Sequence, residues 1–257
     1  MKSTWYNFLS IDTRQPMSYK VSGRTMSGKV ALESMSIAVK LRFSDLGVTP
    51  ENVSRYAGGS HYKPDTERAG LAADILECAS ALANPAFVYA THSINALDPE
   101  KGVSLFLPPD KLDAGIVFIV PTVCTIGHEL ENETSRLVAQ GKALDALFLD
   151  AAGVAILEAL SNEAHLHLKK KAAKKGLFAG CRFGPGFENI PLSAQESLLE
   201  SVNPEAIGVQ LKSSGVLFPL KSLSFWVMWT SKPPPDARTY KCQNCTLNNC
   251  TYRIAAS

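Results

Sequence analysis

A helical repeat of apolar residues between Leu144 and Lys175 is the longest regular pattern in the chain, and any fold must accommodate it. Apolar side chains recur every three or four residues, as expected for one buried helix face; they are Leu144, Leu147, Ala151, Val154, Ile156, Leu157, Leu160, Ala164 and Leu168. The repeat ends in five lysines between residues 169 and 175, followed by Gly176. Cations and a glycine are typical of a helix C-terminus. The pattern predicts one long helix with a solvated cationic end, the alternative being that the lysines dock a partner.

The other segments predict a mixture of helices and strands. Pro64-Asp65-Thr66 begins an amphipathic pattern that ends at Asn84-Pro85, which predicts a second helix. A short helix is expected near 193–202, while residues 30–43 fit a helix or a strand equally well. Strands are expected at 86–90, 103–107, 115–120, 209–218 and 223–229, and residues 182–191 are rich in turn formers.

Composition places the chain among ordinary globular proteins. Its 257 residues are 46% hydrophobic and 19% charged, which excludes disordered and collagen-like classes. The formal net charge of +2 gives no argument for a nucleic-acid or membrane surface. The most apolar run, 114–127, is too short to span a bilayer and contains Pro121. The N-terminus has no secretory pattern, so a cytoplasmic location is expected, where the six cysteines are thiols or metal ligands rather than disulfides.

Several common catalytic patterns do not occur in the sequence. We find neither G-x-x-x-x-G-K-[ST], G-x-G-x-x-G, H-E-x-x-H nor G-x-S-x-G, which lowers the weight of routine hydrolase and nucleotide-binding functions. His165 and His167 are only two residues apart on the long helix, so they cannot share a face as paired ligands. A structural or surface role is expected for each of them.

The segment 180–187, G-C-R-F-G-P-G-F, places Arg182 beside a Gly184-Pro185-Gly186 turn. A guanidinium can bind a carboxylate through two hydrogen bonds, and glycines let a ligand approach the main chain closely. The pattern therefore suits a carboxylate-bearing ligand, although an ordinary turn is the competing interpretation.

This segment, with I-G-V-Q-L-K-S-S at 207–214 and F-P-x-x-S-L-S at 218–224, resembles the AdoMet-binding reactivation domain of cobalamin-dependent methionine synthase. That family has R-P-A-P-G-Y, a short helix, G-x-x-L-T-E-S and P-x-x-S-V-S in this order. The resemblance spans roughly residues 115–253, and residues 1–60 match poorly. It implies an α+β fold with a curved, mainly antiparallel sheet and flanking helices, formed by residues 1–232 as one body.

The resemblance also assigns AdoMet-binding roles. It puts Arg182 on the carboxylate of AdoMet, with backbone contacts from Gly184, Pro185 and Gly186. Phe187 replaces the family's tyrosine and therefore lacks its hydroxyl. Glu158 fits the family's acidic contact on the long helix, to the AdoMet amino group or ribose, with plain surface exposure as the alternative. Tyr240 corresponds to a late tyrosine near the ligand, or only packs.

Residues 233–257 form a proline spacer and a cysteine-rich tail that the methionine synthase domain lacks. Cys242, Cys245 and Cys250 lie within nine residues, a spacing that suits an iron-sulfur cluster or zinc. Redox-active and inert thiols are the alternatives, and Cys181, a distant histidine or an open iron position would complete the site. Cys78 and Cys124 have apolar neighbours and are expected to be buried.

The resemblance implies a role in reductive reactivation, in which AdoMet methylates the cob(II)alamin of an inactive methyltransferase as it is reduced. Such a protein acts as an accessory to methionine synthase or another corrinoid protein, and positioning rather than acid–base chemistry supplies the rate. The chain has no D-x-H-x-x-G cobalamin signature, so a partner must bring the corrinoid, and an electron donor is needed as well. The alternatives are a non-catalytic AdoMet- or corrinoid-protein-binding module with structural zinc, and an unrelated α+β domain with a zinc tail.

Overall fold

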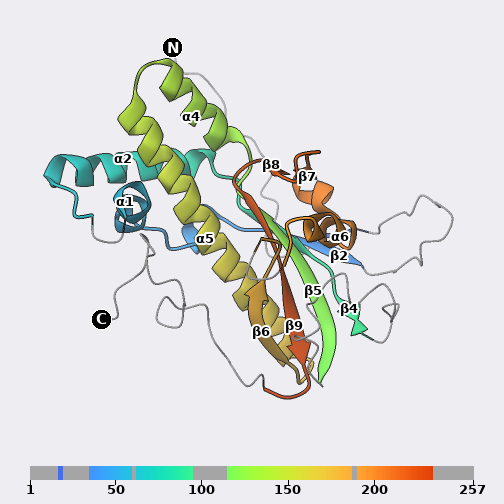
Figure 1. The fold of residues 1–257 in the computed structure, drawn as a ribbon. Coiled ribbons are helices and arrows are strands. Elements are labelled where there is room, and N and C mark those ends of the chain that lie inside the picture. The colour runs from blue at the N-terminus through green and yellow to red at the C-terminus, as the bar shows by residue number, and fades with distance from the viewer. Residues whose placement is uncertain (1–16, 20–34, 60–61, 95–114, 187–189, 234–257) are drawn as a thin grey trace, which may run out of the picture.

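An antiparallel sheet divides the fold into two layers of packing (Figure 1). The computed structural model describes residues 17–19, 35–59, 62–94, 115–186 and 190–233. Within them the strand order is β1-β2-β3-β5-β9-β6, and β4 pairs with β5 beyond the end of β3. The strands are β1 (Met17–Tyr19), β2 (Ser36–Lys40), β3 (Ala86–Tyr89), β4 (His92–Ser93), β5 (Ile116–Thr125), β6 (Phe178–Phe183) and β9 (Ser222–Thr230).

One face of the sheet is covered by helices, of which α5 is the longest and crosses the sheet diagonally (Figure 1). These helices are α1 (Pro50–Gly58), α2 (Thr66–Leu82), α4 (Glu129–Ala139) and α5 (Ala143–Ala173). The opposite face is covered by α6 (Ala194–Glu200), the 3₁₀ turn η4 (Pro204–Ile207) and the hairpin of β7 (Gln210–Leu211) and β8 (Leu217–Phe218). A further 3₁₀ turn, η1 (Phe43–Asp45), precedes α1.

The alternation of side chains along β9 builds a separate hydrophobic core on each face. Phe225, Val227 and Trp229 belong to the core under α5, whereas Trp226 and Met228 pack with the core under α6. Successive side chains of a strand point to opposite faces, so β9 contributes to both cores. Apolar residues on both faces explain why this strand is predictable from a nearly continuous hydrophobic run.

The structure confirms the long helix, the helix beginning at Thr66, and the strands at 86–90 and 223–229. Residues 30–43, which fitted a helix or a strand equally well in the sequence, contain the strand β2. The strand expected at 115–120 continues to Thr125 through Pro121, which lies opposite the break between β3 and β4, where a missing N–H is best tolerated.

Other expectations are corrected. Residues 209–218 form a two-stranded hairpin rather than one strand. Arg182, expected in a turn-rich segment, is in strand β6. Cys78, expected to be buried, is exposed on α2, while Cys124 is buried as predicted. The strand expected at 103–107 lies outside the described residues. Although α5 has 31 residues, no helix in the described part of the chain is long and apolar enough to span a membrane.

Candidate functional site

Arg182 lies on the edge strand β6 and faces α5 because the strand contains a bulge. Ala179 pairs with Trp229 and Arg182 pairs with Val227, so three steps along β6 match two along β9. A regular strand would place residues 179 and 182 on opposite faces of the sheet, and the extra residue puts both on the same one. Arg182 therefore points to the face on which Val227 packs, under α5.

The guanidinium of Arg182 is held by two polar side chains of α5. Its Nη1 donates to Ser161 Oγ at 2.5 Å, and its Nη2 donates to Asn162 Oδ1 at 2.8 Å. The same guanidinium lies over the Phe225 ring, 5.7 Å from its centroid. Two anchored nitrogens and an aromatic support reduce the rotamer entropy that the arginine would lose on binding a ligand.

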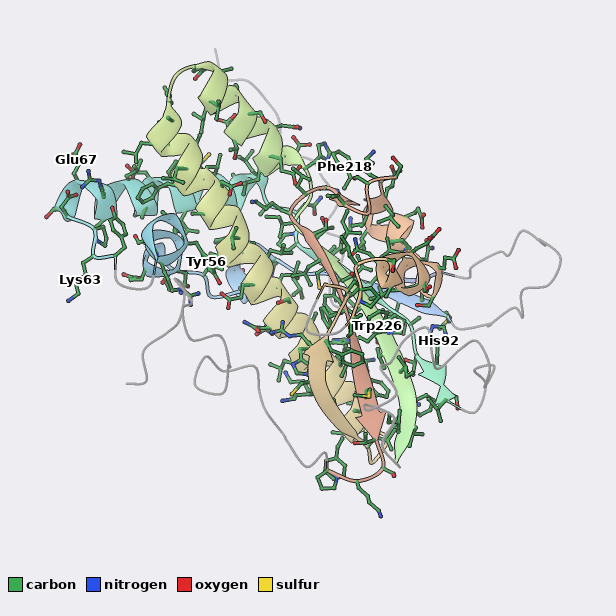
Figure 2. All side chains as sticks on the ribbon, in the orientation of Figure 1. Tyr56, Lys63, Glu67, His92, Phe218 and Trp226 are labelled. Atoms are coloured by element: carbon green, nitrogen blue, oxygen red, sulfur yellow. The ribbon has the colours of Figure 1, made fainter. Side chains whose placement is uncertain are left out.

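Glu158 lies one helical turn before Asn162 on the same side of α5. Residues four apart on a helix have Cβ atoms about 5–6 Å apart, so Glu158 and Asn162 are neighbours on the surface of α5. Two residues of α1 hold Glu158: Arg55 Nη2 donates to Oε2 at 2.9 Å, and Tyr56 Oη donates to the same oxygen at 2.5 Å. Tyr56 lies where α1 meets α5 (Figure 2). Glu158 and the two side chains that hold Arg182 thus lie within one turn of α5.

The two glycines after Arg182 are each required by the backbone, for different reasons. A Cβ on Gly184 would lie 2.7 Å from the carbonyl oxygen of Ser224, so only glycine fits against β9 there. Gly186 has φ of +82° and its N–H donates to the carbonyl of Ile190 at 2.9 Å, closing the turn. Pro185 lies between them and is partly exposed. The two glycines thus allow a tight turn to begin two residues after Arg182.

The two histidines of α5 have unrelated partners. His165 Nε2 lies 2.8 Å from the carbonyl oxygen of Gly180, at the bulge of β6. His167 packs edge-on against Phe87 and Tyr89, with Nε2 3.4 Å from the Tyr89 hydroxyl. Burial lowers the pKa of each histidine to about 4, so both are neutral near pH 7. The predicted structural role therefore fits both residues.

A cavity of about 650 Å³ opens between the starts of α1 and α2. Its lining includes Arg55, Lys63 and Tyr62. Arg55 is the link between this cavity and the site on α5, because its guanidinium also pairs with Glu158. Lys63 lies near the end of α2 that is farther from the sheet (Figure 2).

Comparison with known proteins shows that the chain has a known fold. No protein-family model matches the chain, and no curated protein does. Among solved structures, the MetH reactivation domain bound to AdoHcy is similar, with a TM-score of 0.56 over 81% of this chain and 82% of that one. The chain has the fold of the MetH reactivation domain. Sequence identity between the two is 14%, so the similarity establishes the fold alone.

The reactivation-domain fold confirms the predicted α+β architecture with an antiparallel sheet and flanking helices. Of the predicted site residues, Glu158 lies on α5 one turn before Asn162, which binds Arg182, and Gly184, Pro185 and Gly186 follow Arg182 after one intervening residue. Phe187, Tyr240, Cys242, Cys245 and Cys250 lie outside the described residues. No group of metal-ligating side chains occurs in the part of the chain that the structure describes.

Sequence reasoning missed the side chains that hold the predicted pair. Ser161 and Asn162 follow Glu158 by three and four residues, so helical spacing alone could have placed them on its face. Arg55 and Tyr56 gave no such signal, because helix α1 was not predicted and its contact with α5 spans about a hundred residues of sequence.

Proposed function

We propose that the chain binds AdoMet and supports the reductive methylation of cob(II)alamin on a partner corrinoid protein, such as a methionine synthase. The fold of the MetH reactivation domain supports this proposal, and that domain was solved with AdoHcy, the product that AdoMet becomes when its methyl group leaves. The observation that carries the proposal is that Arg182 is held by Ser161 and Asn162, which follow Glu158 by one turn on the same stretch of α5.

Arg182 and Glu158 have the charges that the amino-acid end of AdoMet requires. In the proposed complex the carboxylate of AdoMet binds Arg182, and Glu158 takes the ammonium group or the ribose hydroxyls. A guanidinium binds a carboxylate in a planar, two-bond geometry that a lysine does not provide. Gly184 lets β6 pack closely against β9 and Gly186 closes the next turn, so both fix the backbone that follows Arg182.

The proposed reaction requires no acid or base from this chain. One electron from a donor reduces Co(II) to Co(I), the Co(I) pair attacks the sulfonium methyl, and the S–CH₃ bond electrons remain on AdoHcy. The protein contributes by holding the methyl group in line with cobalt, which raises the effective concentration of the two reactants. The cobalamin arrives on the partner, in keeping with the absence of its signature from the sequence.

Calorimetric titration of AdoMet into the wild type and into Arg182→Ala tests the binding step. Loss of the charged contact should weaken binding by about 2 kcal/mol or more, roughly thirtyfold. Arg136→Ala is the matched control, because this exposed arginine pairs with Glu133 on α4, away from the site. Equal affinity of wild type and Arg182→Ala would refute the assigned role of Arg182, and a wild type without AdoMet binding would refute the proposed function.

The second candidate is a non-catalytic AdoMet- or corrinoid-protein-binding module, and the spacing of the tail cysteines favours it if they hold structural zinc. The two candidates differ in whether a Co(II) corrinoid protein becomes methylated when this chain, AdoMet and a low-potential reductant are present. Methylation that depends on Arg182 supports reactivation. AdoMet binding without methylation supports the module.

The role of the tail is a separate part of the proposal. Cys242, Cys245 and Cys250 would hold an iron-sulfur cluster that passes the electron, or a zinc ion that only stabilises the tail. Absorbance near 400 nm that bleaches on reduction would support the cluster. A colourless protein with stoichiometric zinc would exclude electron transfer through the tail.

A further inference from the structure

We propose that Arg55 and Tyr56 of α1 are positioning residues that orient the Glu158 carboxylate for the ligand bound by Arg182. This inference rests on the proposed AdoMet-binding function and extends the site from α5 and β6 to a third element. Nothing in the comparison with the reactivation domain assigns a role to α1.

The two α1 residues reach the carboxylate from its buried side. The side chain of Arg55 is 17% exposed, whereas that of Glu158 is 44% exposed. Both donors bind the same oxygen, Oε2, and within the described residues no hydrogen bond reaches Oε1. One oxygen is therefore anchored, and the other remains available to a ligand donor on the exposed side.

Arg55 and Tyr56 also support each other. The Arg55 guanidinium lies over the Tyr56 ring, 4.6 Å from its centroid, so the two side chains form one stacked unit. Arg55 Nε is buried and has no hydrogen-bond partner among the described residues. A buried donor without a partner is costly. The Arg55 side chain is therefore held in a conformation that leaves Nε without a hydrogen bond to any described residue but lets Nη2 reach Glu158.

Arg182 is held in a similar way. Ser161 and Asn162 hold the guanidinium from α5, as Arg55 and Tyr56 hold the carboxylate from α1. Each charged group thus has its own pair of supporting side chains. Pre-oriented polar groups bind more tightly because less side-chain entropy is lost when the ligand arrives.

The test compares AdoMet affinity in the wild type, Tyr56→Phe and Tyr62→Phe. Tyr62→Phe is the matched control, since it also removes one phenol hydroxyl near α1, and among the described residues no hydrogen bond joins Tyr62 to Glu158. Tyr56→Phe should weaken AdoMet binding about tenfold, because it removes a hydrogen bond to a charged group, while Tyr62→Phe binds as the wild type does. Urea unfolding of each variant confirms that the folded state is intact.

A double-mutant cycle separates positioning from a purely structural bridge. In a Glu158→Ala background, Tyr56→Phe should no longer affect AdoMet affinity, because its target is gone. Arg55→Lys, which keeps the charge and loses the planar guanidinium, provides a second variant if Tyr56→Phe folds poorly, and it should also weaken binding.

The outcomes distinguish the two proposals. If the wild type binds AdoMet and Tyr56→Phe binds equally well with lower stability, the contact is only a bridge between α1 and α5, and this inference is overturned. The same conclusion follows if Tyr56→Phe weakens binding to the same extent with and without Glu158. If the wild type itself does not bind AdoMet, the proposed function fails, and the inference fails with it.

Discussion

At the scale of single residues, Gly184 allows β6 to approach β9 closely. A Cβ at this position would lie 2.7 Å from the Ser224 carbonyl oxygen, and this backbone atom cannot move aside as a flexible side chain would. Gly184→Ala should therefore lower the free energy of unfolding by about 1–3 kcal/mol and weaken AdoMet binding, because the turn after Arg182 is displaced. Urea titration and calorimetry measure the two effects. Unchanged stability would show that the strands have more room than this distance allows.

His165 and His167 predict how stability depends on pH. Burial lowers the pKa of each to about 4 in the folded protein, against about 6.5 when unfolded. Between these values the unfolded state binds more protons. The contribution of the two neutral histidines to the free energy of unfolding is therefore fully present above pH 6.5 and is lost as the pH falls toward 4. Denaturant unfolding at pH 7 and pH 5 should show this loss. A variant with His165→Gln and His167→Gln should lose less over the same interval, and an equal loss would contradict the prediction.

At the scale of elements, the bulge in β6 explains why the direction of Arg182 could not be predicted from sequence. Alternation from Ala179 puts residue 182 on the other face of the sheet, and only the pairing with Val227 reveals the extra residue. The long helix α5 was predictable because its signal is local and repeated over many turns. Helix α1 was not, since nine residues give few periods and its partner Glu158 is far away in sequence.

Two helical glycines provide a comparison of packing at this scale. A Cβ on Gly70 of α2 would meet no atom within 4 Å, whereas one on Gly153 of α5 would lie 3.0 Å from side-chain atoms of Leu130 and Lys221. Gly70→Ala should raise the free energy of unfolding by about 0.5–1 kcal/mol through backbone entropy and helix propensity. Gly153→Ala should gain less or lose stability, because Leu130 and Lys221 must move. An equal gain in both variants would mean that α4 is loosely packed on α5.

At the scale of the whole molecule, the sheet keeps the two hydrophobic cores apart, and the candidate site lies on the α5 side of it. The strand and helix patterns were sufficient to predict an α+β fold, because each element carries its own periodicity. The pairing order of the strands and the joining of α1 to α5 depend on contacts between distant segments. Sequence could therefore name Arg182 and Glu158 singly, but it could not supply the side chains that hold them.

The site on α5 and β6 and the cysteine tail belong to separate parts of the chain, so their functions should separate in experiment. Replacing Cys242, Cys245 and Cys250 together with serine should remove bound iron or zinc, because serine is a poor ligand for either metal. AdoMet affinity should stay within about twofold of the wild type, because none of these three cysteines is among the residues assigned to AdoMet binding. Metal analysis and calorimetry on the same samples measure both, and Cys78→Ser, at an exposed position on α2, is the control. A larger loss of AdoMet affinity in the triple variant would mean that the tail reaches the α5 face and completes the ligand site there.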